Sequence, residues 1–336
     1  MSAIGLLGFG SYAPARVMSN DDWAAFVDTS DDWITSRTGI KTRRVAAAEE
    51  TTVDMAEQAA AAALADAGIG PGEIDELIIA TDTPEVYIPD TAAFLQHRLG
   101  MREIPAYDLG GSGCAGFVLA LDLARSRAVT ESATVLVVGV EMLTKLMDWN
   151  DRNTCVLFGD AAGAAVVGAR AGASEIIACV AGTDGSQTDI LQRSAGGTRM
   201  PFSKELGESG EYLKIDFHGR SVFREAVRRM TASAEAVLEK AGLELADVDL
   251  VVPHQANERI IRAVGKALAI PPEKVFSNVA RYGNTGSASI PLALDEVRKS
   301  GGLHSGDLVL MTAFGAGFHW ASALIRFQAV RTEVTQ

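Results

Sequence analysis

The chain has 336 residues, 48% of them hydrophobic, so it is long enough for two domains of ordinary size with a large core. Its 30 basic and 43 acidic side chains give a formal net charge of −13, which argues against general nucleic-acid binding. The three cysteines form neither a disulfide framework nor a metal-ligand spacing, and the N-terminus lacks the features of a signal peptide. No apolar run approaches the roughly 20 residues that cross a bilayer. We therefore expect a cytoplasmic protein that binds neither nucleic acid nor membrane.

Short apolar runs of strand length alternate along the chain with Ala-rich stretches of helical periodicity. The sequence predicts strands at 4–9, 76–80, 134–140, 162–167, 249–252 and 307–312, and helices at 53–67, 91–99, 116–129, 220–241, 259–268 and 289–299. The strands are apolar throughout, which indicates burial on both faces. The alternation predicts an α/β protein with mostly parallel sheets.

The two halves of the chain resemble each other. Residues 64–68, 74–78, 113–122 and 133–138 have counterparts, in the same order, at 238–242, 248–252, 286–295 and 306–311. We expect two similar halves, 1–172 and 173–336, packed face to face, with an irregular excursion at 184–213. In this pairing Ala80 corresponds to His254 and Gly113 to Gly286, so polar groups of the second half approach a helix start of the first. The duplication predicts a functional site at the junction.

Cys114 lies in a Gly-rich segment directly before the helix predicted at 116–129. A thiol at a helix start faces unpaired backbone N–H groups and the positive end of the helix dipole, and both favour the thiolate, which is the nucleophile. The flanking glycines leave room for a substrate. A buried structural cysteine is the more common alternative. By itself this segment leaves both interpretations open.

Three further segments carry polar or Gly-rich sequence next to predicted strands and helices. His254 follows strand 249–252, at the strand end where open α/β sheets place ligands. Asn284 lies in Gly-Asn-Thr-Gly before a helical run, and an ordinary turn or cap explains that motif equally well. The Gly-rich residues 314–318 follow strand 307–312, where backbone N–H groups suit half of an oxyanion hole or simply a tight turn.

Taken together, Cys114 in Gly-Cys-Ala-Gly, His254 in Pro-His-Gln-Ala-Asn and Asn284 in Gly-Asn-Thr resemble the Cys/His/Asn triad of the β-ketoacyl-(acyl carrier protein) synthase III family. The resemblance includes residues 28–40, 151–152, 158–163 and 314–320 and covers nearly the whole chain. It implies the thiolase-like fold, with two duplicated halves in a five-layer α-β-α-β-α arrangement, and a homodimer. The implied reaction is a decarboxylative condensation of an acyl-CoA primer with malonyl-acyl carrier protein. It proceeds through an acyl group on Cys114, needs no cofactor, and initiates fatty-acid or related polyketide synthesis.

The resemblance also implies roles for other groups. His254 and Asn284 would donate hydrogen bonds to an enolate oxygen, and the backbone N–H groups of Cys114 and Ala316 would hold a tetrahedral oxyanion. CoA binding is implied for Thr29, Trp33, Arg37, Arg152, Gly219 and Asn257, and an acyl pocket for Ile88 (across the dimer), Phe158 and Phe314. Docking of an acidic carrier protein is implied for Arg224, Arg259, Arg262 and Lys266, although an ordinary solvated face is the alternative.

The chain departs from the family pattern at four places: Ala316 replaces a usual glycine, His319 a small residue, Gly110–Gly113 the usual alanines, and Ile88 a common Phe. These departures leave open the acyl length and the choice between housekeeping and secondary metabolism. The nearest alternative function is a non-condensing acyltransferase of the same family. From another class, Gly8-Phe-Gly10 suggests an NAD-dependent oxidoreductase, but the third glycine of that fingerprint is missing.

Overall fold

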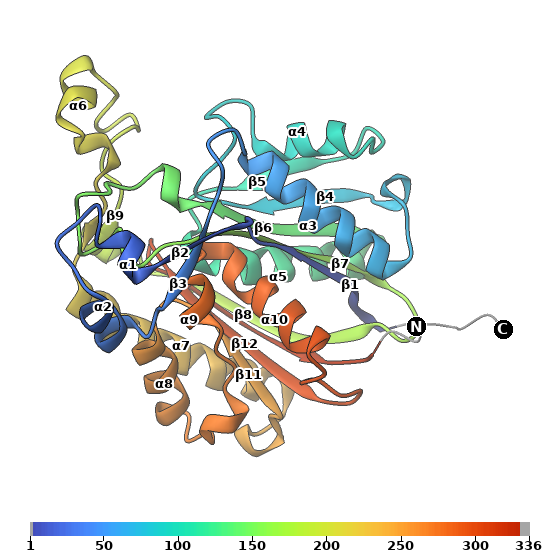
Figure 1. Ribbon diagram of the computed structural model, residues 1–336. Helices are drawn as coiled ribbons and strands as arrows, with labels where there is room; N and C mark the ends of the chain where they lie inside the picture. Colours follow the sequence, from blue (N-terminus) through green and yellow to red (C-terminus); the bar gives the residue numbers. More distant parts are fainter. Residues whose placement is uncertain (1–2, 330–336) are drawn as a thin grey trace.

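A computed structural model describes residues 3–329 of the chain (Figure 1). Its strands are β1 (Ile4–Tyr12), β2 (Arg16–Ser19), β3 (Thr42–Val45), β4 (Glu76–Ala80), β5 (Ala106–Leu109), β6 (Val135–Met142), β7 (Asp160–Ala169), β8 (Ser174–Thr183), β9 (Leu191–Gln192), β10 (Asp216–Phe217), β11 (Leu250–Pro253), β12 (Leu308–Gly315) and β13 (His319–Arg326). Its helices are α1 (Asn20–Trp23), α2 (Asp31–Thr38), α3 (Thr52–Ala67), α4 (Thr91–Arg98), α5 (Gly116–Glu131), α6 (Lys204–Ser209), α7 (Gly219–Ala241), α8 (Glu258–Ala267), α9 (Val279–Tyr282) and α10 (Ser289–Lys299). Every strand and helix predicted from the sequence is confirmed, within a few residues at each end.

Nine strands form one continuous sheet in the order β11-β12-β13-β8-β1-β7-β6-β4-β5. Only β4–β5, β4–β6 and β11–β12 pair in parallel, whereas β1–β7, β1–β8, β6–β7, β8–β13 and β12–β13 are antiparallel. The prediction of mostly parallel sheets is therefore wrong. Strands β5, β8 and β13 of this sheet were not predicted. Strand β13 returns antiparallel to β12, which directly precedes it, and β8 pairs antiparallel with β13 and β1, arrangements that the strand–helix alternation does not reveal.

The two halves of this sheet are joined at β1 and β8, which pair only through Gly5 with Glu175 and Leu6 with Ser174. Helices α5 and α10 lie between the two half-sheets, α3 and α4 cover the outer face of one, and α7 and α8 cover the outer face of the other (Figure 1). The central core contains buried residues of α5, α10 and strands of both halves. The result is the five-layer α-β-α-β-α arrangement.

The elements of the two halves follow the same order. A 3₁₀ turn, Gly113–Ala115, leads into α5, and the turn Gly286–Ala288 leads into α10. Helices α3 and α7 both end at a glycine in the left-handed conformation, Gly68 and Gly242. The boundary predicted at 172/173 falls in the turn between β7 and β8 and stays a prediction.

The glycines of Gly8-Phe-Gly10 have a packing role in the central strand β1. A Cβ at Gly8 would lie 2.4 Å from the backbone N of Ala67, and one at Gly10 would lie 2.2 Å from the carbonyl O of Ala59. Both neighbours belong to α3, so these glycines let the helix approach the strand closely. This explains the motif without a dinucleotide.

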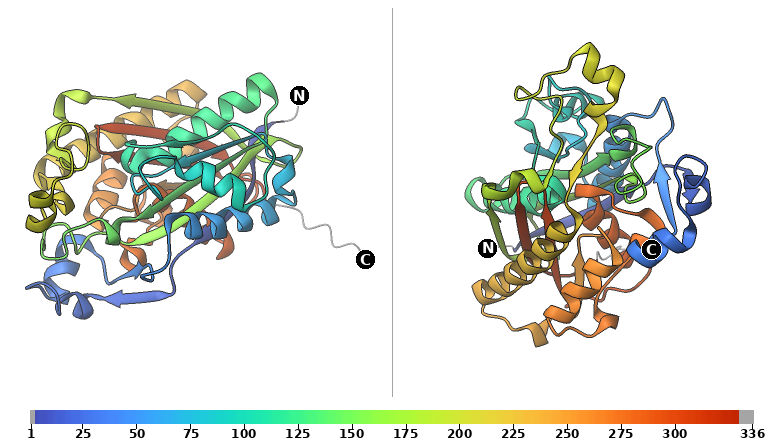
Figure 2. Two further views of the ribbon diagram at one scale, coloured as in Figure 1. Left: turned by 90° about the horizontal axis from the view of Figure 1, so that it is seen from above. Right: turned by 90° about the vertical axis from the view of Figure 1, so that its left-hand side faces the viewer.

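The irregular excursion expected at 184–213 extends to residue 217 in the structure. It includes β9, α6 and β10, and α6 stands away from the body of the molecule (Figures 1 and 2). Across residues 3–329, no helix combines the length and the apolar character that crossing a membrane requires.

Candidate active site

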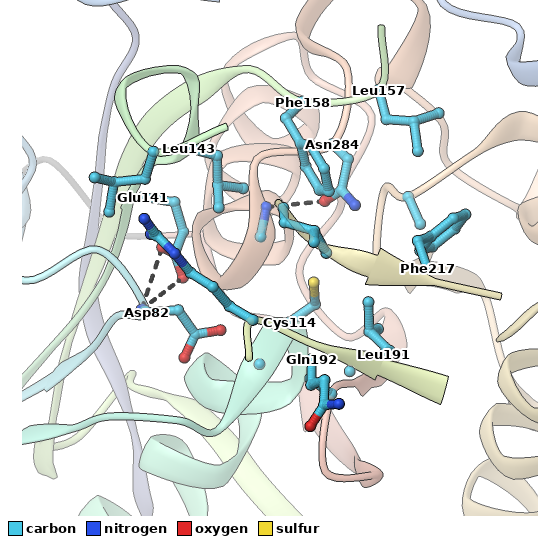
Figure 3. Close-up of a pocket in the computed structure, with 18 of the residues that line it drawn as sticks. Asp82, Cys114, Glu141, Leu143, Leu157, Phe158, Leu191, Gln192, Phe217 and Asn284 are labelled. Carbon is cyan, nitrogen blue, oxygen red and sulfur yellow. Dashed lines mark hydrogen bonds between the residues drawn. The ribbon is translucent and has the colours of Figure 1, made fainter. Parts of the chain in front are cut away.

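A cavity of about 1660 Å³ opens where the two halves meet (Figure 3). Its lining includes Cys114 from the first half and His254, Asn284 and Ala316 from the second. Four strands, β4, β6, β11 and β12, end at this cavity. The residues at or just after their ends line it, in the same order Asp82, Glu141, His254 and Gly315. The duplication thus brings together residues that are far apart in the sequence.

Cys114 is the middle residue of the turn Gly113–Ala115, immediately before α5, and its side chain is half-buried. Burial raises the pKa of its thiol, and negative charge on the nearby acidic pair Asp82 and Glu141 raises it further, whereas a hydrogen bond with Asn284 acts in the opposite direction. The helix start alone therefore does not make Cys114 a thiolate. Its reactivity has to come from the groups around it.

His254 is buried at the end of β11, and its backbone N–H donates to the carbonyl O of Thr312 at 2.9 Å. Burial lowers the pKa of the imidazole to about 3, so the ring is neutral at physiological pH. The Ser289 hydroxyl lies 2.6 Å from Nδ1. With Ser289 donating to Nδ1, the ring hydrogen is on Nε2, the nitrogen left free for a ligand. His254 is then a neutral hydrogen-bond donor.

Asn284 is held by its backbone beside residue 158: its N–H donates to the carbonyl O of Leu157 at 2.8 Å, and its carbonyl accepts from Gly159 N–H at 3.0 Å. Its side-chain Oδ1 accepts from Gly286 N–H at 2.9 Å. Because this bond occupies the oxygen, the amide nitrogen is the group available to the cavity. Asn284 is thus a second neutral donor near Cys114.

The backbones of the Cys114 turn and of the end of β12 are in direct contact. A Cβ at Gly113 would lie 2.6 Å from the backbone N of Ala316, and one at Gly315 would lie 2.3 Å from the backbone N of Cys114. Only glycine permits this approach, and Gly113 also has a φ of +56°. The contact brings the N–H groups of Cys114 and Ala316 to one place, as an oxyanion hole requires.

Two acidic residues of the cavity were missed by the sequence analysis. Asp82 and Glu141 lie directly after or at the end of strands β4 and β6, and both line the cavity with Cys114 (Figure 3). Burial and the Asp82 charge raise the pKa of Glu141 well above its usual value, and desolvation also raises the pKa of Asp82. The strand-end rule that singled out His254 would have found both residues.

The residues implied in nucleotide binding gather around Trp33 on α2. The guanidinium of Arg37 lies 4.5 Å from the Trp33 ring centroid, and that of Arg152 lies 4.6 Å from it. Arg152 also donates to the carbonyl O of Asp28 at 2.8 Å. Trp33 and Arg37 line the cavity, whereas Arg152 lies beside them outside its lining. An aromatic ring flanked by two cations suits a phosphorylated adenine.

The other residues implied in CoA binding are partly explained by local structure. Asn257 caps α8 by accepting from Arg259 N–H at 2.8 Å, and its amide donates to the carbonyl O of Arg37 at 3.2 Å. Asn257 and Gly219, the first residue of α7, line the cavity. Thr29 lies outside the lining, and its hydroxyl oxygen is buried without a hydrogen-bond partner.

Of the three residues implied in the acyl pocket, Phe158 and Phe314 are buried and line the cavity. Ile88 is 80% exposed and is not part of the lining formed by its own chain. Its neighbours Val86 and Tyr87, however, do line the cavity, so the loop that carries Ile88 borders the site. A role for Ile88 through a second copy of the chain stays a prediction.

The four basic residues implied in docking lie on the adjacent helices α7 and α8. Arg259 lines the cavity mouth, and its guanidinium lies 5.9 Å from the Phe223 ring centroid. Arg262 is paired with Glu258 at 2.7 Å and Arg224 with Glu225 at 3.5 Å. Within residues 3–329, Arg259 and Lys266 form no ion pair, and Arg259 is the one of the four that lines the cavity.

Comparisons with known proteins agree with this geometry. Residues 107–185 match the family model for 3-oxoacyl-(acyl carrier protein) synthase III, and residues 238–327 match the model for its C-terminal part. The chain is 46% identical over 325 residues to β-ketoacyl-(acyl carrier protein) synthase III of Oleidesulfovibrio alaskensis, covering 96% of this chain and 98% of the relative.

Two solved structures show the same similarity in three dimensions. The crystal structure of 3-oxoacyl-(acyl carrier protein) synthase III from Aquifex aeolicus superimposes with a TM-score of 0.88 and 45% identity, covering 96% of this chain and 100% of the other. The priming β-ketosynthase of the R1128 polyketide pathway gives a TM-score of 0.89 at 37% identity, with 97% of each chain covered. The protein described here belongs to the β-ketoacyl-(acyl carrier protein) synthase III family.

Proposed function

We propose that this chain condenses an acyl-CoA primer with malonyl-acyl carrier protein, giving a 3-oxoacyl-acyl carrier protein and CO₂. The observation that supports the proposal most directly is that Cys114, His254 and Asn284, from both halves, line a single cavity. The relatives named above are synthases of this class along nearly their whole length. The reaction would begin the synthesis of a fatty acid or a related polyketide chain.

In the first half-reaction Cys114 takes up the primer. A bond forms between Cys114 Sγ and the acyl carbon, the bond from that carbon to the CoA sulfur breaks, and the thiol proton ends on the released CoA. The backbone N–H groups of Cys114 and Ala316 stabilise the tetrahedral oxyanion between these events. One thioester replaces another, so the step requires no cofactor and no ATP.

In the second half-reaction the malonyl thioester loses CO₂. The electrons of the broken C–C bond pass to the thioester oxygen as an enolate, which accepts hydrogen bonds from His254 Nε2 and the Asn284 amide. Neutral donors are effective here because they are already oriented before the enolate forms. The enolate carbon then bonds to the acyl carbon on Cys114, and Sγ leaves as a thiolate, which takes up a proton from water to restore the thiol.

Three features support proposals about the partners of this chain. The loop at 84–90 exposes Val86, Tyr87 and Ile88 beside the cavity, which supports a homodimer in which this loop meets a second copy. Arg259 at the cavity mouth supports docking of an acidic carrier protein. Soluble acyl-CoA and a free catalytic thiol support a cytoplasmic location.

The alternative of a non-condensing acyltransferase is less well supported. Such an enzyme transfers the acyl group without forming an enolate, so it has no need for a donor amide beside the neutral His254. Here the Asn284 oxygen is engaged by Gly286 N–H, which orients the amide nitrogen toward substrate.

Intact-mass measurement after incubation with a panel of acyl-CoAs tests the proposal. We expect an adduct of the acyl mass on the wild-type chain and on Cys179→Ala, whose cysteine lies buried in β8, but none on Cys114→Ala. Addition of malonyl-carrier protein should then discharge the adduct and release CO₂. Failure of every acyl-CoA to label Cys114 would refute the proposed function.

A further inference from the structure

The acidic pair Asp82 and Glu141 has no role in the reaction described above, although both residues face the cavity of the nucleophile (Figure 3). Among residues 3–329, no Lys, Arg or His forms an ion pair with either carboxyl group. The Asp82 backbone N lies 3.2 Å from both carboxyl oxygens of Glu141, and the charge of Asp82 raises the pKa of Glu141, so the pair retains a proton more readily than an isolated acid. The location of that proton decides where the remaining negative charge lies.

The hydrogen bonds around Ser287 place the proton on Glu141. Ser287 Oγ lies 2.8 Å from the carbonyl O of Ala80 and 2.9 Å from Glu141 Oε1. The carbonyl can only accept, and the hydroxyl has one hydrogen, so Ser287 donates to Ala80. Glu141 Oε2 accepts from the Thr83 hydroxyl at 2.9 Å, and both of its oxygens lie 3.2 Å from the Asp82 backbone N. With the Ser287 hydrogen on Ala80, a hydrogen between Oε1 and Ser287 has to come from a protonated Glu141. Glu141 is also fully buried, whereas Asp82 is exposed to the cavity.

The charge on Asp82 is supported by the segment that precedes the nucleophile. Burial raises the pKa of Asp82, and hydrogen bonds from the backbone N–H groups of Gly113 and Gly111 oppose this rise because they favour the ionised form. His319 also lies close enough to stabilise the anion. Cys114, Glu141, Asp90 and Asp108 line the same cavity as Asp82. Because Gly113 directly precedes Cys114, the carboxylate is tied to the segment that carries the thiol.

We infer that Asp82 is a specificity-determining residue: its negative charge beside Cys114 disfavours acyl groups that are themselves anionic and directs neutral acyl groups to the thiol. The consequence, which rests on the proposed function, is that dicarboxylic acyl-CoAs and the malonyl thioester do not load onto Cys114. The malonyl group is thereby kept for the second half-reaction. Two like charges in a partly desolvated cavity repel enough to change relative rates by roughly tenfold.

Alkylation of Cys114 tests the charge without assuming the enzymatic reaction. Iodoacetamide and iodoacetate react with a thiolate by the same displacement of iodide and are of similar size, but only iodoacetate is anionic. The ratio of their rates cancels any change in the thiol pKa. We expect Asp82→Asn to raise the iodoacetate-to-iodoacetamide ratio by roughly tenfold. Glu273→Gln, which removes an exposed surface charge outside the cavity lining, should leave the ratio unchanged.

Glu141→Gln is a second, independent test of which carboxyl group carries the charge. The Gln amide donates to Ser287 as the protonated acid does, so this variant should fold and keep the wild-type ratio. A ratio that rises in Glu141→Gln would place the charge on Glu141 and overturn the inference. So would an unchanged ratio in a folded Asp82→Asn.

Acyl loading connects the charge to substrate choice. Succinyl-CoA and butyryl-CoA have the same number of acyl carbons and differ by a terminal carboxylate, so their adducts can be compared directly by intact mass. We expect Asp82→Asn to raise succinyl loading relative to butyryl loading by a similar factor. If the alkylation ratio changes but no acyl-CoA labels Cys114, the proposed function fails while the charge assignment stands. An altered alkylation ratio with unchanged succinyl selectivity would refute the role in specificity.

Discussion

The contact between the Cys114 turn and the end of β12 makes Gly315→Ala the most informative single change at the oxyanion hole. The new Cβ would lie 2.3 Å from the backbone N of Cys114, 2.9 Å from the carbonyl C of Gly113 and 3.0 Å from its Cα. All three neighbours are main-chain atoms of the turn that carries the nucleophile. No flexible side chain can move aside, so the two backbone segments have to separate.

The size of the effect follows from this distance. Ordinary contacts of a Cβ begin near 3.4 Å, so the segments have to part by about 1 Å. A displacement of that size at a reacting centre costs about 10²-fold in rate, and the loss of one oxyanion donor costs about 10²–10³-fold. Because both half-reactions pass through an oxyanion, acylation and condensation should both slow by about 10²–10³. Crowding of this kind typically destabilises a fold by about 1–3 kcal/mol.

Acylation is followed by rapid-quench intact mass with a short acyl-CoA, and condensation by CO₂ release, at a temperature well below the Tm of the variant. Gly185→Ala is a matched control, because a Cβ there meets no atom within 4 Å and its φ is not positive. It should keep both rates. A Gly315→Ala protein that acylates at the wild-type rate would show that the two N–H groups do not act together as the structure implies.

Three further changes separate the other functional groups. Asn284→Ala should still acquire an acyl adduct but lose condensation by about 10²–10³-fold, because only the enolate step uses its amide; equal loss of both steps would contradict this division. Arg259→Glu should raise the KM for carrier protein several-fold and leave acyl-CoA labelling intact, and an unchanged KM would remove Arg259 from the docking face. The pKa of His254, about 3 when folded against 6.5 when unfolded, means that the unfolded chain binds one more proton between these values. Stability should therefore fall by about 1.4 kcal/mol per unit as the pH drops below about 6.5. The free energy of unfolding of His254→Asn, measured with denaturant at several pH values, should depend less steeply on pH by that amount. An unaltered pH dependence would refute the assignment.

The sequence predicted the elements of this fold better than their pairing. Strand β6 is a continuous apolar run, and its burial on both faces was visible in advance. The same pattern cannot tell whether a neighbour runs parallel or antiparallel. Strand β13 follows β12 after a turn of three residues, so the two can only pair antiparallel. That turn contains the Gly-rich residues which had been examined for chemistry rather than for topology.

At the site, motifs identified the functional residues but not their protonation states. Cys114 was expected to be stabilised as a thiolate by its helix start, yet burial and two acidic neighbours raise its pKa. The helix start is visible in sequence because it is local. The opposing carboxyl groups come from β4 and β6, and their proximity depends on the tertiary fold. Asp82 and Glu141 were missed for the same reason. In the sequence each is a single acidic residue at a strand end, and only the fold brings the two together.

The duplication explains why the cavity contains two different sets of groups. Cys114 lies in the turn before α5 and packs against the end of β12, whereas Ser287 lies in the corresponding turn before α10 and faces Glu141 at the end of β6. One backbone arrangement is therefore used twice at the same junction. In the first copy the glycines leave two N–H groups open to a substrate, and in the second a buried acid and a hydroxyl satisfy each other. The second copy thereby favours the proton on Glu141 and leaves the charge of the pair on Asp82, beside the thiol of the first.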